Sequence, residues 1–234
     1  FAVIATAGTT IRGAIDPIKE IASFCNEEQL WLHVDAAIGG VFALSDSTSD
    51  LVKDISLANS VTVNPQKVLG ITKTSSLLLV ADASKLFSCF STGFPYIEPS
   101  LGNDFQGGEI GLQGTRSAEI IKLWLGLRQL GLKGIKYLLD ECLQRRRSFQ
   151  EQIDSKRLKI ITGPLHLLAI TPKTMGSKEA ELWSIATKNK LLENKFMLSR
   201  PKYKGRSYLK AVMGNPHTKS IHINKLATII NESL

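Results

Sequence analysis

The stretch Ser60–Ser76, SVTVNPQKVLGITKTSS, contains the lysine around which the rest of the chain can be interpreted. An alternating apolar run ends at Asn64 and Pro65, so Lys67 lies just beyond the end of a predicted strand. In the stretch LWLHVDAA, 32 positions upstream, Asp35 ends a second strand-like run. This separation is close to that of one β-α-β unit, about 30 residues. Two neighbouring parallel strands would bring the carboxylate and the amine to one edge of a sheet, where ligands bind in open α/β sheets.

A carboxylate and an amine are the two protein groups that pyridoxal 5'-phosphate (PLP) needs to act as an electron sink. A lysine forms a Schiff base with the cofactor, and an aspartate keeps the ring nitrogen protonated. The alternatives are that Lys67 is an ordinary loop lysine and that Asp35 caps a turn. An acid at the end of so apolar a strand is costly to bury unless it is paired, and the small residues Gly70, Ser75 and Ser76 follow the lysine. We therefore expect Lys67 and Asp35 to bind the cofactor.

Several motifs resemble, in order and spacing, the carboxy-terminal half of the PLP-dependent group II amino-acid decarboxylases. This family includes glutamate, aromatic amino-acid, diaminobutyrate and cysteine sulfinate decarboxylases. The motifs span nearly all of the chain: ATAGTT, DP, LHVDAA, SVTVNPQK, GTRSAEIIKLWLGLRQLG and GNPHT. The resemblance implies a fold-type I α/β enzyme that decarboxylates an amino acid to an amine through a Lys67 Schiff base.

The resemblance also implies further residues around the cofactor. Ala37 is similar to the small residue that packs under the cofactor ring, and His33 alternates with Asp35 and should face the same side. Other positions that match cofactor contacts of the family are Thr9, Thr10, Asn64 and Gln66. The alternatives are a satisfied core histidine for His33 and ordinary turn chemistry for the threonines and the asparagine.

Four positions bear on the reaction and the substrate. Tyr96, in FPYIEPS, lies where the family has a mobile loop whose tyrosine acts as general acid in the neighbouring subunit; an ordinary loop aromatic is the alternative. Arg116, in GTRSAE, stands where many members have paired arginines, and a structural ion pair is equally consistent. Gln66 replaces a histidine that contacts the cofactor. Lys210 replaces an arginine that in some members binds the substrate carboxylate, a bidentate contact that a lysine cannot reproduce.

The differences from the family at Gln66 and Lys210 leave two alternatives to amino-acid decarboxylation open. One is other PLP chemistry, such as an aldehyde-forming decarboxylase or a carbon–carbon lyase. The other is a catalytically impaired homologue with a binding or regulatory role.

The net charge of +8 is unevenly distributed along the chain. Residues 151–234 carry 15 Lys and Arg against 6 Asp and Glu, whereas residues 1–150 carry 14 against 15. We therefore expect residues 1–150 to form the C-terminal part of a large, PLP-binding domain with a mostly parallel sheet, and residues 151–234 to form a small α+β domain. The lysines are scattered and lack a nucleic-acid-binding motif, so we expect a solvated basic surface and no nucleic-acid partner.

Hydrophobic periodicity predicts alternating strands and helices. The apolar run Ala2–Ala7 predicts a strand buried on both faces. Asp16 and Pro17 predict the N-cap and first position of a helix, and the glycine-rich residues 84–114 predict a long connection. Further strands are expected at 30–36, 61–64, 75–81, 158–161, 165–171 and 208–213, and further helices at 178–192 and 221–230.

Two consecutive helices are predicted after this connection. Ser117 is expected to cap the first helix and Gly131 to end it, with an apolar face formed by Ile120, Ile121, Trp124, Leu127 and Leu130. The second helix is expected to run from about Lys133 into the basic residues 145–147, which suit the last turn of a helix and need no ligand.

The remaining expectations concern the setting of the protein. The chain begins FAVIATAG, inside a predicted buried strand, so we expect an N-terminal half that supplies much of the phosphate site. Three widely spaced cysteines fit reduced thiols in the cytoplasm, and no apolar run reaches the length of about 18 residues typical of a membrane span. The expected partners are a small amino-acid substrate and a second copy of the chain in a homodimer with a shared active site, without a metal or a membrane.

Overall fold

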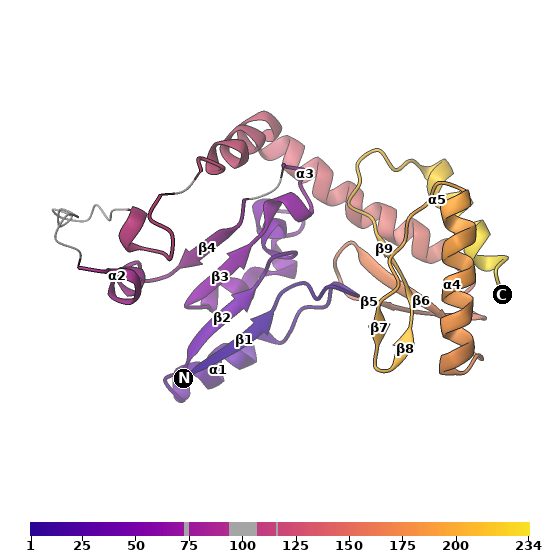
Figure 1. The fold of residues 1–234 in the computed structure, drawn as a ribbon, viewed down its shortest axis with the longest axis horizontal. Helices are drawn as coiled ribbons and strands as arrows, with labels where there is room; N and C mark the ends of the chain where they lie inside the picture. The colour runs from indigo at the N-terminus through magenta and orange to yellow at the C-terminus, as the bar shows by residue number, and fades with distance from the viewer. Residues whose placement is uncertain (73–74, 94–106, 116) are drawn as a thin grey trace.

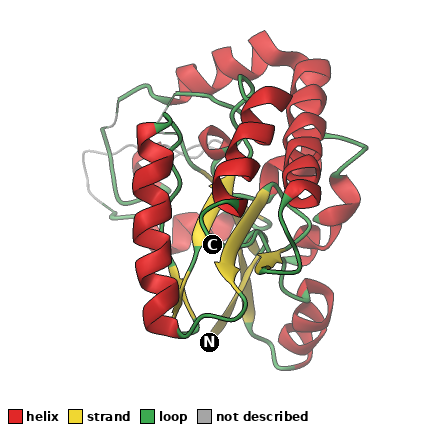
Figure 2. Ribbon diagram, turned by 90° about the vertical axis from the view of Figure 1, so that its right-hand side faces the viewer, coloured by secondary structure: helices red, strands yellow, loops and turns green. Residues whose placement is uncertain are grey.

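The computed structural model describes residues 1–72, 75–93, 107–115 and 117–234. These residues form two larger sheets with separate hydrophobic cores and, in addition, a two-stranded hairpin. The long helix α3 (Ile120–Gln152) begins at the top of the view in Figure 1, above the first sheet, and descends to the right to the second sheet. In Figure 2 the strands lie in the middle, between helices on both sides.

The first sheet has the order β1-β2-β3-β4. The strands are β1 (Ala2–Thr6), β2 (Trp31–Asp35), β3 (Ser60–Val63) and β4 (Leu77–Val80). The parallel pairing of β1 with β2 and of β2 with β3 confirms that Asp35 and the lysine segment follow neighbouring parallel strands. The last pair, β3 with β4, is antiparallel, so the sheet is mixed at this edge.

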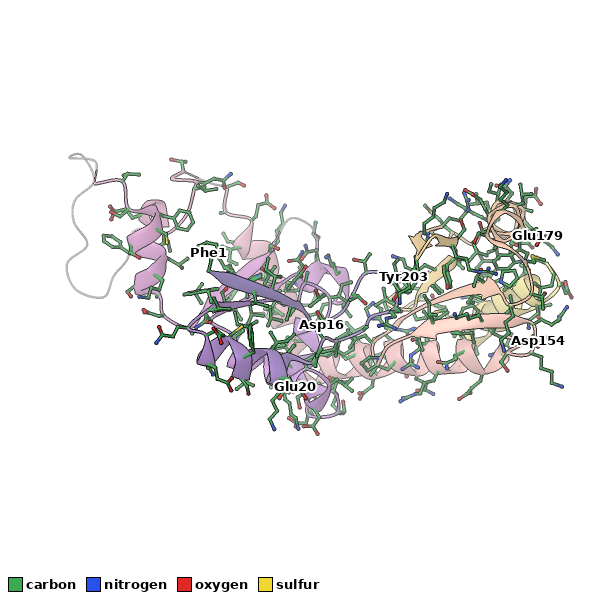
Figure 3. All side chains as sticks on the ribbon, turned by 90° about the horizontal axis from the view of Figure 1, so that it is seen from below. Phe1, Asp16, Glu20, Asp154, Glu179 and Tyr203 are labelled. Carbon is green, nitrogen blue, oxygen red and sulfur yellow. The ribbon has the colours of Figure 1, made fainter. Side chains whose placement is uncertain are left out.

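Helix α1 (Ile18–Glu27) covers one face of this sheet, and Figure 3 shows it, with Glu20, below β1. Its buried residues Ile18, Ala22 and Cys25 belong to the core under β1 and β2. The expectation that Asp16 is the N-cap of this helix is wrong, because Pro17 occupies the N-cap position. The Asp16 carboxylate instead accepts a hydrogen bond from the Thr6 N–H at 2.8 Å.

The connection from β2 to β3 contains 3-10 helices rather than the α-helix of a standard β-α-β unit. These are η1 (Gly40–Leu44), η2 (Ser49–Leu51) and η3 (Lys53–Leu57). Another 3-10 turn, η4 (Pro65–Lys67), follows β3 and contains the candidate lysine.

The opposite face of the sheet is open among the described residues. The expectation that the first strand is buried on both faces is wrong, because the Ile4 side chain is 71% exposed. Ile4 lies opposite His33, and Leu78 lies opposite Thr62 and is 54% exposed. Apolar side chains on the outer strands therefore flank the polar residues of the central strands on this face.

The second sheet is antiparallel, with the order β5-β6-β9. Its strands are β5 (Leu158–Thr162), β6 (Leu167–Pro172) and β9 (Leu209–Val212), and a small hairpin is formed by β7 (Lys202–Tyr203) and β8 (Arg206–Ser207). Helices α4 (Ser177–Glu193) and α5 (Ser220–Asn231) pack with these strands around the second core.

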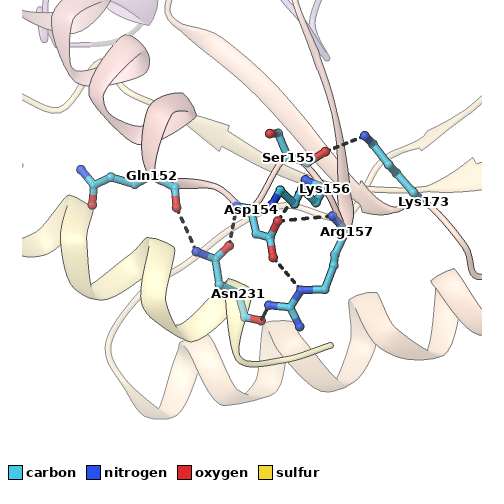
Figure 4. Close-up of polar contacts among 7 residues, drawn as sticks. All are labelled: Gln152, Asp154, Ser155, Lys156, Arg157, Lys173 and Asn231. Atoms are coloured by element: carbon cyan, nitrogen blue, oxygen red, sulfur yellow. Dashed lines mark hydrogen bonds and ion pairs between the residues drawn. The ribbon is translucent and has the colours of Figure 1, made fainter.

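A polar network fixes the junction of α3, β5 and α5 (Figure 4). The Asp154 carboxylate pairs with the Arg157 guanidinium at 2.6 Å. Asn231 donates to the Gln152 carbonyl at 2.9 Å and accepts the Asp154 N–H at 3.0 Å. The end of α5 is thereby bound to the end of α3.

The expected break in helix α3 is confirmed, because Gly131 has a non-helical φ of 57° and ψ of 175°. Two other expectations for this helix are wrong. The expected apolar face before Gly131 is largely exposed, whereas Leu123 is buried. The basic residues 145–147 are not in the last turn, since the helix continues to Gln152.

The long connection is also partly structured. Helix α2 (Ser84–Phe90) and the 3-10 turn η5 (Gly107–Glu109) lie within it, while residues 94–106 are outside the described part. None of the helices in the described ranges has the length and apolar character needed to cross a lipid bilayer.

Candidate active site

The carboxyl ends of the three parallel strands bring the polar residues of the candidate site together. Asp35 pairs with Thr6 on one side and with Thr62 on the other, so the three side chains share the open face. The Asp35 carbonyl accepts the Ala7 N–H at 2.9 Å, and the Ala36 N–H donates to Thr62 at 3.0 Å. The backbone that carries Asp35 is thus fixed from both sides.

The Asp35 carboxylate is exposed at this edge. Its Oδ1 accepts the Ala37 N–H at 3.0 Å, and no hydrogen bond from the described residues reaches its Oδ2. One oxygen orients the carboxylate and the other remains available to a ligand. The desolvation cost expected for this acid does not arise in the described part of the chain, because the carboxylate is not buried.

His33 lies on the same face as Asp35, as predicted from their alternation. Its Nδ1 is 2.8 Å from Ser60 Oγ, and its Nε2 is 3.3 Å from Thr62 Oγ1. The Trp31 indole also donates to Ser60 Oγ, at 2.9 Å. Both ring nitrogens of His33 therefore have partners that hold the plane of the ring. Ser60 and Thr62 were missed as partners, although their own alternation along the strand places them on this face.

Lys67 ends the turn that follows β3, and its side chain is exposed. Its N–H donates to the Asn64 carbonyl at 3.0 Å, while the Asn64 N–H donates to the Ala37 carbonyl at 3.3 Å. The Asn64 amide oxygen also accepts a hydrogen bond from the Ser76 hydroxyl. Asn64 thus links the segment that carries the lysine to the turn that follows Asp35.

Gln66 provides a buried polar group without a protein partner. Its Oε1 has no hydrogen bond to any described residue. The position is that of the expected histidine, and a neutral amide there offers a carbonyl oxygen and an N–H donor in place of a titrating ring.

Thr9 and Thr10 follow β1 beside this site. Thr9 Oγ1 accepts the Ala14 N–H at 2.9 Å, which stabilises the turn. The Thr10 carbonyl accepts a hydrogen bond from Lys210 Nζ at 3.3 Å. Lys210 is therefore brought to the rim of the candidate site from the second sheet. Tyr96 and Arg116 lie outside the described residues.

A buried polar cluster behind the site was not anticipated from the sequence. Arg145, expected only to suit the last turn of its helix, is 6% exposed, and its Nε donates to the Met213 carbonyl at 3.1 Å. His166 is fully buried and stacks on Phe42, with ring centroids 5.8 Å apart. Burial, with a smaller effect of the Arg145 and Lys210 charges, lowers the pKa of His166 to about 4. A histidine in an apolar strand was the only signal in the sequence for this cluster.

The donor set fits PLP. An exposed amine, a carboxylate with a free oxygen, the small side chain of Ala37 and the unpartnered buried amide oxygen of Gln66 lie on or beside the same strand ends. These groups offer a covalent attachment point, a charge for the ring nitrogen, room for the ring and a polar contact.

Comparisons with known proteins support PLP as the cofactor. The family model described as the pyridoxal-dependent decarboxylase conserved domain matches residues 1–170. The crystal structure of mouse CSAD in its apo form is 26% identical, with a TM-score of 0.87, and the match covers 100% of this chain and 52% of that one.

Two plant structures share the fold at lower identity. Oryza sativa TDC with PLP and tryptamine is 19% identical, with a TM-score of 0.89, over 99% of this chain and 50% of that one. Rhodiola rosea 4-hydroxyphenylacetaldehyde synthase is 23% identical, with a TM-score of 0.84, over 100% of this chain and 49% of that one. The chain spans about half the length of these proteins. Because the family model matches most of its residues, the chain belongs to the family of pyridoxal-dependent decarboxylases, with pyridoxal phosphate as cofactor.

Proposed function

We propose that the polypeptide containing this chain is a carboxy-lyase that converts an amino acid to an amine and carbon dioxide. The observation that carries the proposal is the position of Asp35, with one free carboxylate oxygen, on the strand next to the one that leads to Lys67. When bound, PLP supplies an electron sink for the bond to the substrate carboxylate.

Each residue of the site has a distinct part in this proposal. Lys67 attaches the cofactor covalently through its amine, and Asp35 stabilises the protonated ring nitrogen by its charge. Ala37 leaves space for the ring. Polar contacts to the cofactor are assigned to His33, Thr9, Thr10, Asn64 and Gln66.

The reacting end of the substrate involves residues at the rim. We assign proton donation after carbon dioxide leaves to Tyr96, acting across a homodimer interface. Arg116 and Lys210 are candidates for contacts with the substrate carboxylate. In this proposal an N-terminal half completes the phosphate site, residues 1–150 and 151–234 are the two domains, and the protein works in the cytoplasm.

The second candidate is an oxidative reaction that forms an aldehyde, in which dioxygen accepts two electrons and the amino group leaves as ammonia together with carbon dioxide. Gln66 leaves this reaction open, because its side chain does not titrate and so cannot deliver a proton as a histidine next to Lys67 would. The similarity to a plant aldehyde synthase extends over the whole chain but establishes the fold alone.

Borohydride reduction of the complete polypeptide, followed by peptide mapping, tests the proposal. A pyridoxyl group on Lys67 is expected, and a label on another lysine with Lys67 unmodified would refute the assignment. Product analysis with a panel of amino acids then separates the two reactions, since one yields an amine and the other an aldehyde.

A further inference from the structure

The loop between β1 and α1 is closed by its own hydrogen bonds. The N–H groups of Gly8 and Thr9 both donate to the Ala14 carbonyl at 2.9 Å. The Ala14 N–H donates in return to Thr9 Oγ1 at 2.9 Å. Residues 8–14 therefore form one unit, in which a shift at one position moves the others.

One side of this loop contacts the turn that follows Asp35. The Gly39 N–H donates to the Ala7 carbonyl at 3.0 Å. A Cβ atom on Gly8 would lie only 2.9 Å from Gly39 N, so the two backbones are in close contact. Movement of the loop is consequently transmitted to the turn that contains Ala37.

The other side of the loop contacts the second half of the chain. The Gly163 N–H donates to the Arg12 carbonyl at 2.6 Å. A Cβ atom on Gly163 would lie 2.4 Å from the Gly13 carbonyl oxygen, and the buried Leu165 packs against Gly8 and Gly13. The loop is thus enclosed between the candidate site and the segment that precedes β6.

Lys210 adds a charged contact from β9 to this loop. Its Nζ donates to the Thr10 carbonyl at 3.3 Å, and no carboxylate of the described residues pairs with it. The half-buried position lowers the pKa of the ammonium group through desolvation. The backbone of β9 is itself held, since the Lys210 N–H donates to Ser199 and the Met213 N–H donates to His166. The lysine therefore extends from a fixed strand.

We propose that Lys210 is a positioning residue, which holds the loop of residues 8–14 against the cofactor site through the Thr10 carbonyl. This inference rests on the proposed function and replaces the candidate contact of Lys210 with the substrate carboxylate. A single carbonyl needs only one N–H donor, which a compact ammonium supplies, whereas a substrate carboxylate is bound best by a planar guanidinium. Lys210 suits the carbonyl contact better than a contact with the substrate carboxylate.

The test uses the complete polypeptide and the variant Lys210→Met, first without cofactor. Hydrogen exchange is measured for the amides of residues 8–14, and PLP alone is then titrated while its bound absorption band is followed. Lys173→Met is the matched control, because Lys173 Nζ also donates to a backbone carbonyl, that of Ser155, in a network that does not include the loop (Figure 4).

We expect exchange in the loop to quicken and the PLP dissociation constant to rise, each by at least about threefold, the scale expected for a lost charged hydrogen bond at a partly exposed site. The Lys173 variant should change neither quantity. Lys210→Arg should restore both, because arginine also donates to a carbonyl. Lys210→Ala, which has no donor at this position, replaces the methionine variant if the latter does not fold.

Unchanged loop exchange and unchanged PLP affinity in Lys210→Met would overturn the inference, and a selectively raised KM for substrate would then assign Lys210 to the substrate carboxylate. A different result would refute the proposed function without refuting the role of Lys210. In that case the parent polypeptide binds no PLP, while hydrogen exchange in the loop of residues 8–14 is still faster in the Lys210 variant.

Discussion

Asp35 is exposed at the end of β2, so its charge can be removed without disturbing the core. We predict that Asp35→Asn lowers turnover at least about tenfold, because an opposite charge next to a titrating nitrogen shifts the pKa of that nitrogen by one unit or more. Stability should change little, since the amide oxygen can still accept the Ala37 N–H. Steady-state kinetics and thermal denaturation of the complete polypeptide measure the two effects.

Asp46→Asn is the control for this prediction. Asp46 is also exposed but lies in the connection after η1, away from the strand ends. Its replacement should leave turnover and stability unchanged. Equal turnover in Asp35→Asn and the parent protein would remove Asp35 from the mechanism.

The buried His166 predicts a dependence of stability on pH. Its pKa in the fold is about 4, below the usual value of 6.5, so the folded state favours the neutral ring. Between these values the unfolded state binds more protons, and stability falls as the pH is lowered from about 6.5 to about 4. The loss should approach about 3 kcal/mol, because one pKa unit corresponds to about 1.4 kcal/mol.

Chemical denaturation of the parent protein and of His166→Gln at several pH values measures this contribution. The difference between their free energies of unfolding should shrink in the acid range. His217→Gln, at an exposed position, should follow the parent at every pH. Parallel pH profiles for the parent and His166→Gln would contradict the assignment.

At the scale of elements, α3 depends on the backbone of Gly131. A φ of 57° with a ψ of 175° is a conformation that essentially only glycine adopts, and a Cβ there would meet nothing within 4 Å. We predict that Gly131→Ala destabilises the fold by about 1–3 kcal/mol through backbone strain alone. Urea denaturation gives the change in the free energy of unfolding.

Gly134→Ala is the matched control in the same helix. Gly134 lies within the helical segment, and its added Cβ would make ordinary contacts with Leu130 at 3.5 Å. We expect this variant to be stabilised by about 0.5–1 kcal/mol, because alanine favours the helix. A similar loss of stability in both variants would mean that the conformation of Gly131 is not the cause.

The same helix shows what could be predicted from the sequence. The break at Gly131 was predicted, because the departure of glycine from helical geometry is a local property. The burial of Arg145 was not, because its partner, the Met213 carbonyl, lies 68 residues away. The antiparallel direction of β4 was likewise not evident, since an apolar strand has the same pattern in either direction.

In the candidate site, too, local features were predicted from the sequence and contacts between distant segments were not. Alternation placed His33 and Asp35 on one face, and the parallel order of β2 and β3 is as expected from their spacing. The contact between Lys210 and Thr10 joins residues 200 positions apart. Such a contact depends on how the two sheets pack and has no signature in either local stretch.

At the scale of the whole molecule, several large apolar side chains of the described residues are exposed and belong to neither hydrophobic core. Ile120, Ile121, Trp124 and Leu125 on the first part of α3 are each 53–59% exposed, and Ile4 is exposed on the open face of the first sheet. Clustered apolar surface of this kind marks sites of association. In the proposed homodimer, the second subunit or the N-terminal half would cover these surfaces.

We predict that the double substitution Ile121→Glu and Trp124→Glu weakens self-association of the chain. Burying one large apolar side chain contributes about 1.5–3 kcal/mol, so loss of two should raise the dissociation constant at least about hundredfold. Sedimentation velocity over a range of concentrations measures this change, in the chain and in the complete polypeptide. Tyr137→Glu is the control, since Tyr137 is 63% exposed on the same helix beyond Gly131. Unaltered association in the double variant would show that this part of α3 is not an interface, and the open sheet face at Ile4 would become the surface to test.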